Sequence, residues 1–230
     1  MRWAAVLLVA LVTSDSPEPA ALVYRVAALS PKVTAERARS PIPVAEGATL
    51  AAGDELRTGW RGRVTLAVPT HATHFEIAPN TLVRLASDEP GVLVVVQSGL
   101  LRAVFDAFTG RDERLVATPG ALLAVRGTRY ALRVAPDGEA TVAVFSGAVE
   151  VLPRQPSLPP ATVRQGELCS FGPARAPVRR PLPPTLHEGN WERHQGMTPA
   201  RHGDPGGSNS TDAPGCSSPS PRRPSGRGRG

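Results

Sequence analysis

The segment Thr118-Pro-Gly-Ala-Leu-Leu-Ala-Val-Arg-Gly-Thr-Arg-Tyr130 decides the fold, because it joins two strand-forming runs across a glycine. Residues 121–125 are apolar on both faces, and residues 128–134 alternate in polarity. A glycine is unfavourable inside a strand, so Gly127 needs a reason such as a bulge, a sharp bend or a close backbone approach. We therefore expect two strands to meet at Gly127.

Similar short runs extend outward from this segment in both directions. Runs of four to eight residues recur from Val44 to Phe171, separated by Gly, Pro, Asn or Asp. Residues 92–96 are wholly apolar, which is typical of a doubly buried or central strand, and Pro136-Asp-Gly138 predicts a hairpin turn. The turn signals recur about every 8 to 12 residues, as in all-β folds. We expect a β-solenoid-like or β-roll domain of short glycine-punctuated strands, with a sandwich as the alternative.

Composition suggests one domain with flexible ends. The 230 residues include 25 Pro and 22 Gly but only 3 Trp, 2 Tyr and 5 Phe. We expect a leader at 15–43 with a candidate first strand, a β domain at 44–172, and a disordered Pro/Gly/Ser/Arg-rich tail at 173–230. The tail has nine Arg against four Asp or Glu, so it carries five of the net +6 charges. Leu186 and Trp191 within it could mark a short docking segment.

The N-terminus has the pattern of a secretory signal peptide. A basic start at residues 1–3 precedes nine apolar residues and then the polar residues 13–16. Nine residues are too few to span a bilayer, which takes about 20. We therefore expect a signal peptide at 1–14, no transmembrane span, and a periplasmic or secreted protein. In that compartment Cys169 and Cys216 could form a disulfide or remain free.

Four motifs, at 46–59, 96–102, 118–130 and 145–151, resemble in order and spacing those of the FecR domain, over roughly residues 44–172. The resemblance implies a periplasmic β domain, which in the best-known members passes a signal from an outer-membrane transporter to an extracytoplasmic sigma factor. Within residues 1–43 we expect no sigma-binding helical domain together with a full transmembrane helix. The chain is therefore more similar to free-standing exported members of the family.

Residues in these motifs are the candidates for structural or interaction roles. Arg126 and Thr128 either pair with a carboxylate and the backbone, respectively, or contact a ligand. The full set is Gly53, Asp54, Thr58, Gly59, Gly99, Arg126, Gly127, Thr128 and Gly147.

No residue pattern indicates catalysis, a cofactor or a metal. His71 and His74 lie three residues apart, so on a strand they point to opposite faces and chelate poorly. Cys169 has no patterned histidine partner, and no Gly-x-Ser-x-Gly elbow is present. Asp54 follows a turn glycine, where a carboxylate ordinarily bonds to the backbone. We expect no catalytic, cofactor-binding or metal-binding residues and no enzymatic activity.

These features favour an exported interaction or sensory module in the bacterial cell envelope, with an unidentified envelope protein as its partner. Exposed edge strands would offer backbone pairing to that partner. The alternative is a structural or polymer-binding component whose basic tail makes weak contact with anionic polymer or lipid headgroups. Nucleic acid is not expected as a partner, because the fold itself is nearly neutral and the compartment is extracytoplasmic.

Overall fold

Fifteen strands and two short 3-10 helices form the part of the chain that the computed structural model describes, residues 22–86, 89–106 and 114–192. The described residues belong to one compact unit. The elements are β1 (Val23–Leu29), β2 (Val33–Arg37), β3 (Ser40–Ile42), β4 (Thr49–Ala51), β5 (Glu55–Thr58), β6 (Val64–Val68), η1 (Pro69–His71), β7 (Thr73–Ile77), β8 (Leu82–Leu85), β9 (Val92–Phe105), β10 (Leu115–Ala117), β11 (Ala121–Val134), β12 (Ala140–Pro153), β13 (Ala161–Arg164), β14 (Glu167–Gly172), β15 (Arg175–Pro181) and η2 (Glu188–Asn190).

Three strands, β9, β11 and β12, are 14 residues long and bend in the middle. Each contains a glycine with a positive φ, namely Gly99 (107°), Gly127 (58°) and Gly147 (78°). The pairing of β11 with β12 shifts register beside Gly127, so this glycine marks a β-bulge. The expectation that two strands meet at Gly127 is therefore wrong. The glycine bends one long strand and does not end it.

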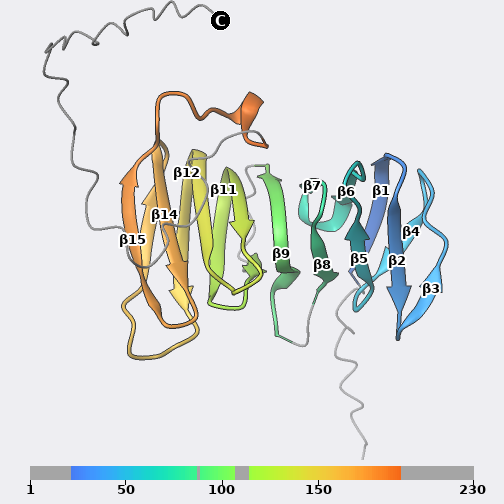
Figure 1. Ribbon diagram of the computed structural model, residues 1–230, viewed down its shortest axis with the longest axis horizontal. Coiled ribbons are helices and arrows are strands. Elements are labelled where there is room, and N and C mark those ends of the chain that lie inside the picture. The colour runs from blue at the N-terminus through green and yellow to red at the C-terminus, as the bar shows by residue number, and fades with distance from the viewer. Residues whose placement is uncertain (1–21, 87–88, 107–113, 193–230) are drawn as a thin grey trace, which may run out of the picture. The chain divides into compact units, whose positions relative to one another are not determined.

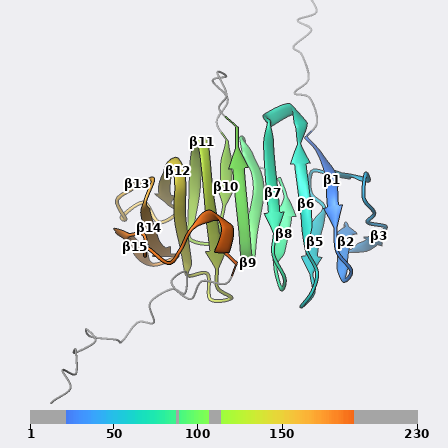
Figure 2. The same ribbon diagram turned by 90° about the horizontal axis from the view of Figure 1, so that it is seen from above.

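The two halves of each bent strand pair with different neighbours, so the sheet folds into two layers (Figures 1 and 2). Layer A contains, in spatial order, β4, β1, β6, β7, the second halves of β9 and β11, the first half of β12, β14 and β15. Layer B contains β3, β2, β5, β8, the first half of β9, β10, the first half of β11, the second half of β12, and β13.

The main hydrophobic core lies between the layers. Alternate residues of each strand point into it, as the period of two along a strand requires. Phe105 contacts Phe75 edge-on and stacks with Tyr130 at a centroid distance of 6.1 Å. The Tyr24 hydroxyl of layer A donates to the carbonyl of Leu93 in layer B at 2.5 Å. The prediction of an all-β fold is thus confirmed. The solenoid and roll features are not confirmed.

The turn predicted at Pro136–Gly138 is confirmed as the hairpin between β11 and β12, where the Ala135 amide donates to the Glu139 carbonyl at 2.7 Å. The apolar run 92–96 is also confirmed as a central segment, because this half of β9 lies between β8 and β10.

Strands also lie outside the predicted β domain of residues 44–172, on both sides of it. Strands β1, β2 and β3 lie within the predicted leader, and β1 is a fully paired strand between β4 and β6. Within the predicted tail, β15 pairs with β14, and Leu186 and Trp191 are buried. The composition hid β15, because its pairing is made by the backbone of a Pro- and Arg-rich segment. The predicted signal peptide, Cys216 and the remaining tail lie outside the described residues.

Candidate interaction surface

Asp54 fixes the turn between β4 and β5. Its side chain is fully buried, and its two oxygens accept hydrogen bonds from Arg37 Nε at 2.7 Å and Nη2 at 2.8 Å. Asp54 Oδ2 also accepts from the Ala51 amide at 2.9 Å, and the hydrogen bonds from Arg37 hold the pKa of this carboxyl below its usual range. The neighbouring Gly53 donates its amide to the Leu85 carbonyl at 2.6 Å. Asp54 and Gly53 therefore position a loop.

Thr58, Gly59 and Gly99 form a second group around Thr81. The Thr58 hydroxyl oxygen accepts from the Thr81 amide at 2.9 Å. Gly99 lies directly against Thr81, so that a Cβ at position 99 would come within 2.5 Å of the Thr81 Cα. Gly59 donates its amide to the Lys32 carbonyl at 2.7 Å. These contacts hold the end of β5 against the bend in β9.

Gly127, Thr128 and Gly147 form a third group, at the facing bends of β11 and β12. Thr128 is buried, and its hydroxyl donates to the Ala148 carbonyl at 2.8 Å. A Cβ at Gly147 would lie 2.6 Å from the Gly127 carbonyl oxygen. Arg126 is exposed, and no ion pair joins it to a carboxylate among the described residues. The nine predicted residues thus lie in three separate groups and do not converge on one site; all but the exposed Arg126 make close backbone contacts or hydrogen bonds that fix the chain.

The groups considered for reactive chemistry lie apart. The described residues contain no group of three or more His, Cys, Asp or Glu arranged to hold a metal ion. Cys169 is buried in β14, and burial raises the pKa of its thiol to about 11. His71 ends η1, whereas His74 is exposed on β7. Along the described ranges, no helix has both the length and the apolar character needed to cross a membrane.

The outward side of layer A, which we call the outer face, carries a row of charged side chains across adjacent strands. Glu76 in β7 is directly opposite Arg102 in β9, and Arg102 Nη2 donates to Glu76 Oε1 at 2.5 Å. Arg129 in β11 is exposed on the same face, two residues before Ala131, which lies opposite Arg102. The alternation of the strands aims these residues away from the core.

Beside this row, the outer face has an apolar centre. Ala131, Ala143 and Leu168 are cross-strand neighbours in β11, β12 and β14. They form a second buried cluster with Leu186 and Trp191, which are 2% and 6% exposed. This cluster exists because residues 182–192, which we call the strap, cover the face.

The strap leaves the end of β15 and runs back toward β9 (Figures 1 and 2, orange). Its Glu188 accepts a hydrogen bond from Arg102 Nη1 at 3.1 Å and lies 3.9 Å from Arg129 Nη1. Its Glu192 forms an ion pair with Arg63, next to β6. The strap therefore combines two apolar anchors with two carboxylates that bind the arginines of the outer face.

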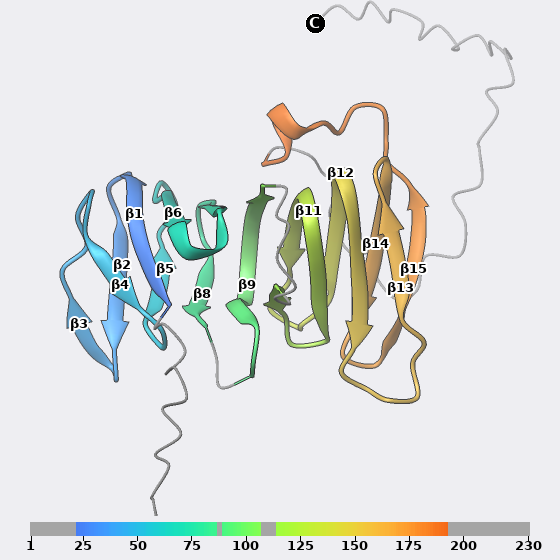
Figure 3. The ribbon, with the colours of Figure 1, turned by 180° about the vertical axis from the view of Figure 1, so that it is seen from behind.

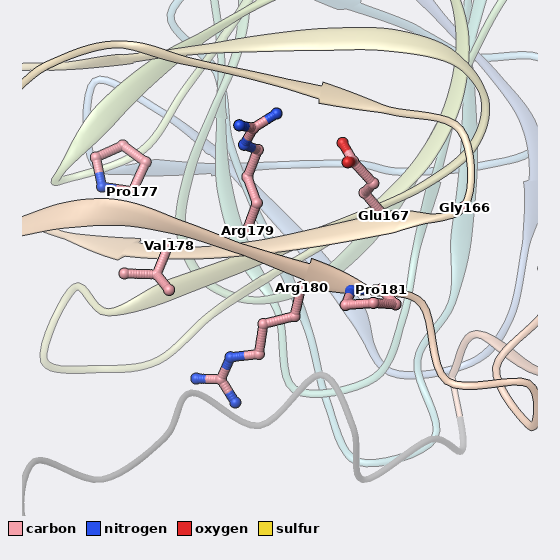
Figure 4. Close-up of a pocket in the computed structure, with 7 residues that line it drawn as sticks. All are labelled: Gly166, Glu167, Pro177, Val178, Arg179, Arg180 and Pro181. Atoms are coloured by element: carbon pink, nitrogen blue, oxygen red, sulfur yellow. The ribbon is translucent and has the colours of Figure 1, made fainter.

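A second surface feature is an open groove of about 560 Å³ along β15. It is lined by Gly166, Glu167 and residues 177–181. Figure 4 shows Arg179 and Arg180 on opposite sides of the strand, with a proline two residues before Arg179 and another directly after Arg180. The groove is basic and proline-lined.

Sequence reasoning identified the two strap anchors but missed the arginines that bind the strap. Arg63, Arg102 and Arg129 are far apart in the sequence, and only the strand pairing brings them onto one face. The signal available for Arg102 was the alternation of side chains along its strand. Because Leu101 points into the core, its neighbour Arg102 must point outward.

The protein is thus an all-β domain. Its motif residues make hydrogen bonds that fix the backbone. Residues 54–150 match the family model described as FecR protein. This match confirms the resemblance drawn from the four motifs.

Two crystal structures of a proposed anti-sigma factor from Parabacteroides distasonis ATCC 8503, at 1.65 and 2.50 Å resolution, are similar to the chain. Each has 16% sequence identity and a TM-score of 0.46, over 55% of this chain. The chain spans 59% of the length of each of those structures. No curated protein matches the sequence.

Proposed function

We propose that this protein is a non-enzymatic regulatory module that acts by binding another protein in the bacterial cell envelope. The observation that carries the proposal is the FecR domain at residues 54–150. The predicted signal peptide at 1–14 supports export, which N-terminal sequencing of the protein from a periplasmic fraction would test.

The outer face is the surface best suited to such binding. Arg129 is half exposed, and Arg63 is exposed to a similar extent. Charged side chains at a rim steer and orient an approaching partner more than they add affinity. The edges of the sheet are less suited, because β3, β4 and β13 are three or four residues long and β15 contains two prolines that lack an amide donor.

Affinity capture from the envelope fraction of the source bacterium tests the proposal. The immobilised full-length chain should retain a specific protein, and so should a chain that ends at residue 192. Arg129→Glu should reduce recovery of that protein. Arg57→Glu, on an exposed position of β5 in layer B, serves as the matched control. Equal recovery with both variants would remove the outer face from the proposal.

The second candidate function is contact with anionic envelope polymer or lipid headgroups. The basic groove along β15 supports it, together with the arginines of the predicted tail. Such binding should fall steeply as salt is raised, because it depends on screened charges. Sedimentation with purified cell-wall polymer, with and without residues 193–230, distinguishes this function: polymer binding requires the tail, whereas protein capture does not.

A further inference from the structure

The strap is attached to the sheet in a way that differs from the strands. The Leu182 amide still donates to the Gly166 carbonyl at 2.7 Å. Beyond that point, the backbone hydrogen bonds recorded in the described chain stay within the strap itself, as from Leu186 to Pro183 and from Asn190 to His187. Beyond Leu182, the ion pairs and apolar contacts described between the strap and the outer face are made by side chains.

The strap also carries its own local structure. The His187 Nδ1 accepts from the Gly189 amide at 3.1 Å, and the Asn190 side chain accepts from the His187 amide at 2.9 Å. These reciprocal bonds form a capping box around η2. A segment that holds its own turn can leave the face and return to it with little rearrangement.

Few contacts hold the strap in place. Leu186 and Trp191 are the apolar anchors, and the partly exposed pair of Arg63 and Glu192 adds little. Against these contacts stands the entropy lost when the strap is ordered. Segments with few buried contacts belong to the least stable parts of a native structure.

The outer face has a hydrogen-bond donor near the strap that the strap does not bind. Arg102 is 19% exposed, and its Nε is buried without a hydrogen-bond partner among the described residues, although both terminal nitrogens bind carboxylates. Buried donors are normally satisfied. A carboxylate placed differently from Glu188 could use this donor as well.

From these observations we propose that the outer face is a docking site for an acidic, tryptophan-bearing segment of a partner protein, and that the strap occupies this site in the absence of the partner. The proposal rests on the proposed function and names the chemistry of its partner. The strap itself shows what the site accepts, which is a leucine and a tryptophan five residues apart, with a carboxylate between them and another directly after.

The strap competes with a partner segment for the same site. Because it is tethered to the chain, it acts at an effective concentration of about millimolar and should weaken binding of the partner segment. Loosening the strap should therefore raise affinity for a segment added in trans. This prediction separates an exchangeable strap from a permanent part of the fold.

The experiment uses the full-length chain and a fluorescently labelled peptide of residues 182–192, Leu-Pro-Pro-Thr-Leu-His-Glu-Gly-Asn-Trp-Glu. In fluorescence anisotropy, the peptide should bind the Trp191→Ala chain at least about tenfold more tightly than the wild-type chain. Trp60→Ala is the matched control, because Trp60 is 58% exposed and lies outside the cluster under the strap. Glu188→Arg, which loosens the strap without altering its packing, should increase affinity in the same direction.

Two further measurements define the site. A peptide with alanine in place of the tryptophan should not bind, and Arg129→Glu in the Trp191→Ala chain should weaken binding of the original peptide. Equal affinity of the wild-type and both loosened chains, or no binding to any of them, would overturn the proposal. Strap-dependent dimers in light scattering would also overturn it, because the occupant would then be a second copy. The peptide assay needs no natural partner, so its result is independent of the capture experiment.

Discussion

Gly147→Ala and Gly166→Ala form a matched pair that tests how closely the bends within β11 and β12 approach each other. Both glycines have a φ of +78°, so alanine incurs the same backbone strain of about 1–2 kcal/mol at each position. The surroundings differ. A Cβ at Gly147 would lie 2.6 Å from the Gly127 carbonyl oxygen and 3.2 Å from the Thr128 Cα, whereas a Cβ at Gly166 would meet no atom within 4 Å.

Relief of the contact at Gly147 requires movement of backbone, which the Thr128 hydroxyl ties to the Ala148 carbonyl at 2.8 Å. Overpacking of this kind costs about 1–3 kcal/mol. Gly147→Ala should therefore lower the free energy of unfolding by roughly 2–5 kcal/mol, and Gly166→Ala by roughly 1–2 kcal/mol. Urea unfolding followed by far-UV circular dichroism measures both values. Equal losses would refute the close approach of the two bends.

Three further predictions concern buried polar groups. The Tyr130 hydroxyl is buried without a partner among the described residues, whereas the Tyr24 hydroxyl donates to the Leu93 carbonyl at 2.5 Å. In thermal unfolding, Tyr130→Phe should thus be neutral or stabilising, and Tyr24→Phe should lower the free energy of unfolding by about 1 kcal/mol. Because the folded pKa of Asp54 is lowered, its contribution is complete above its ordinary pKa of about 4 and is lost as pH falls through the lowered value. Asp54→Asn should therefore cost roughly 1–3 kcal/mol at pH 7, and urea titrations should show that this loss shrinks at acid pH. In a Cys216→Ser chain, Cys169, with a thiol pKa of about 11, should react with a thiol reagent at pH 8 only after denaturation; rapid reaction of the folded chain would contradict its burial.

The sequence predicted which segments form strands better than it predicted where each strand ends and which strands it pairs with. Alternating polarity identified β6, β7 and the second half of β11, because each lies with one face on the core. The same reasoning treated Gly127 as the end of a strand. A local pattern does not reveal whether the chain continues after a bend, since that depends on which neighbour pairs with each half.

The outer face could be predicted only in part. Leu186 and Trp191 are conspicuous as bulky apolar residues in a polar tail, which indicates that they could mark a short docking segment. Their partners Ala131 and Ala143 are small, so nothing in their local sequence indicates a contact surface. The pairing of β11 with β12 places these two alanines side by side. The residues next to each alanine in the sequence do not reveal this pairing.

The ends of the folded sheet have a further consequence for the protein at high concentration. β3 and β4 lie at one end and β13 and β15 at the other (Figure 3). The longest of them, β15, lacks amide hydrogens at Pro177 and Pro181 and places two arginines between these positions. If two β15 edges met, the prolines would interrupt the ladder of hydrogen bonds between them, and their arginines would be brought together. At high concentration we therefore expect β15 to disfavour edge-to-edge association through this end of the sheet.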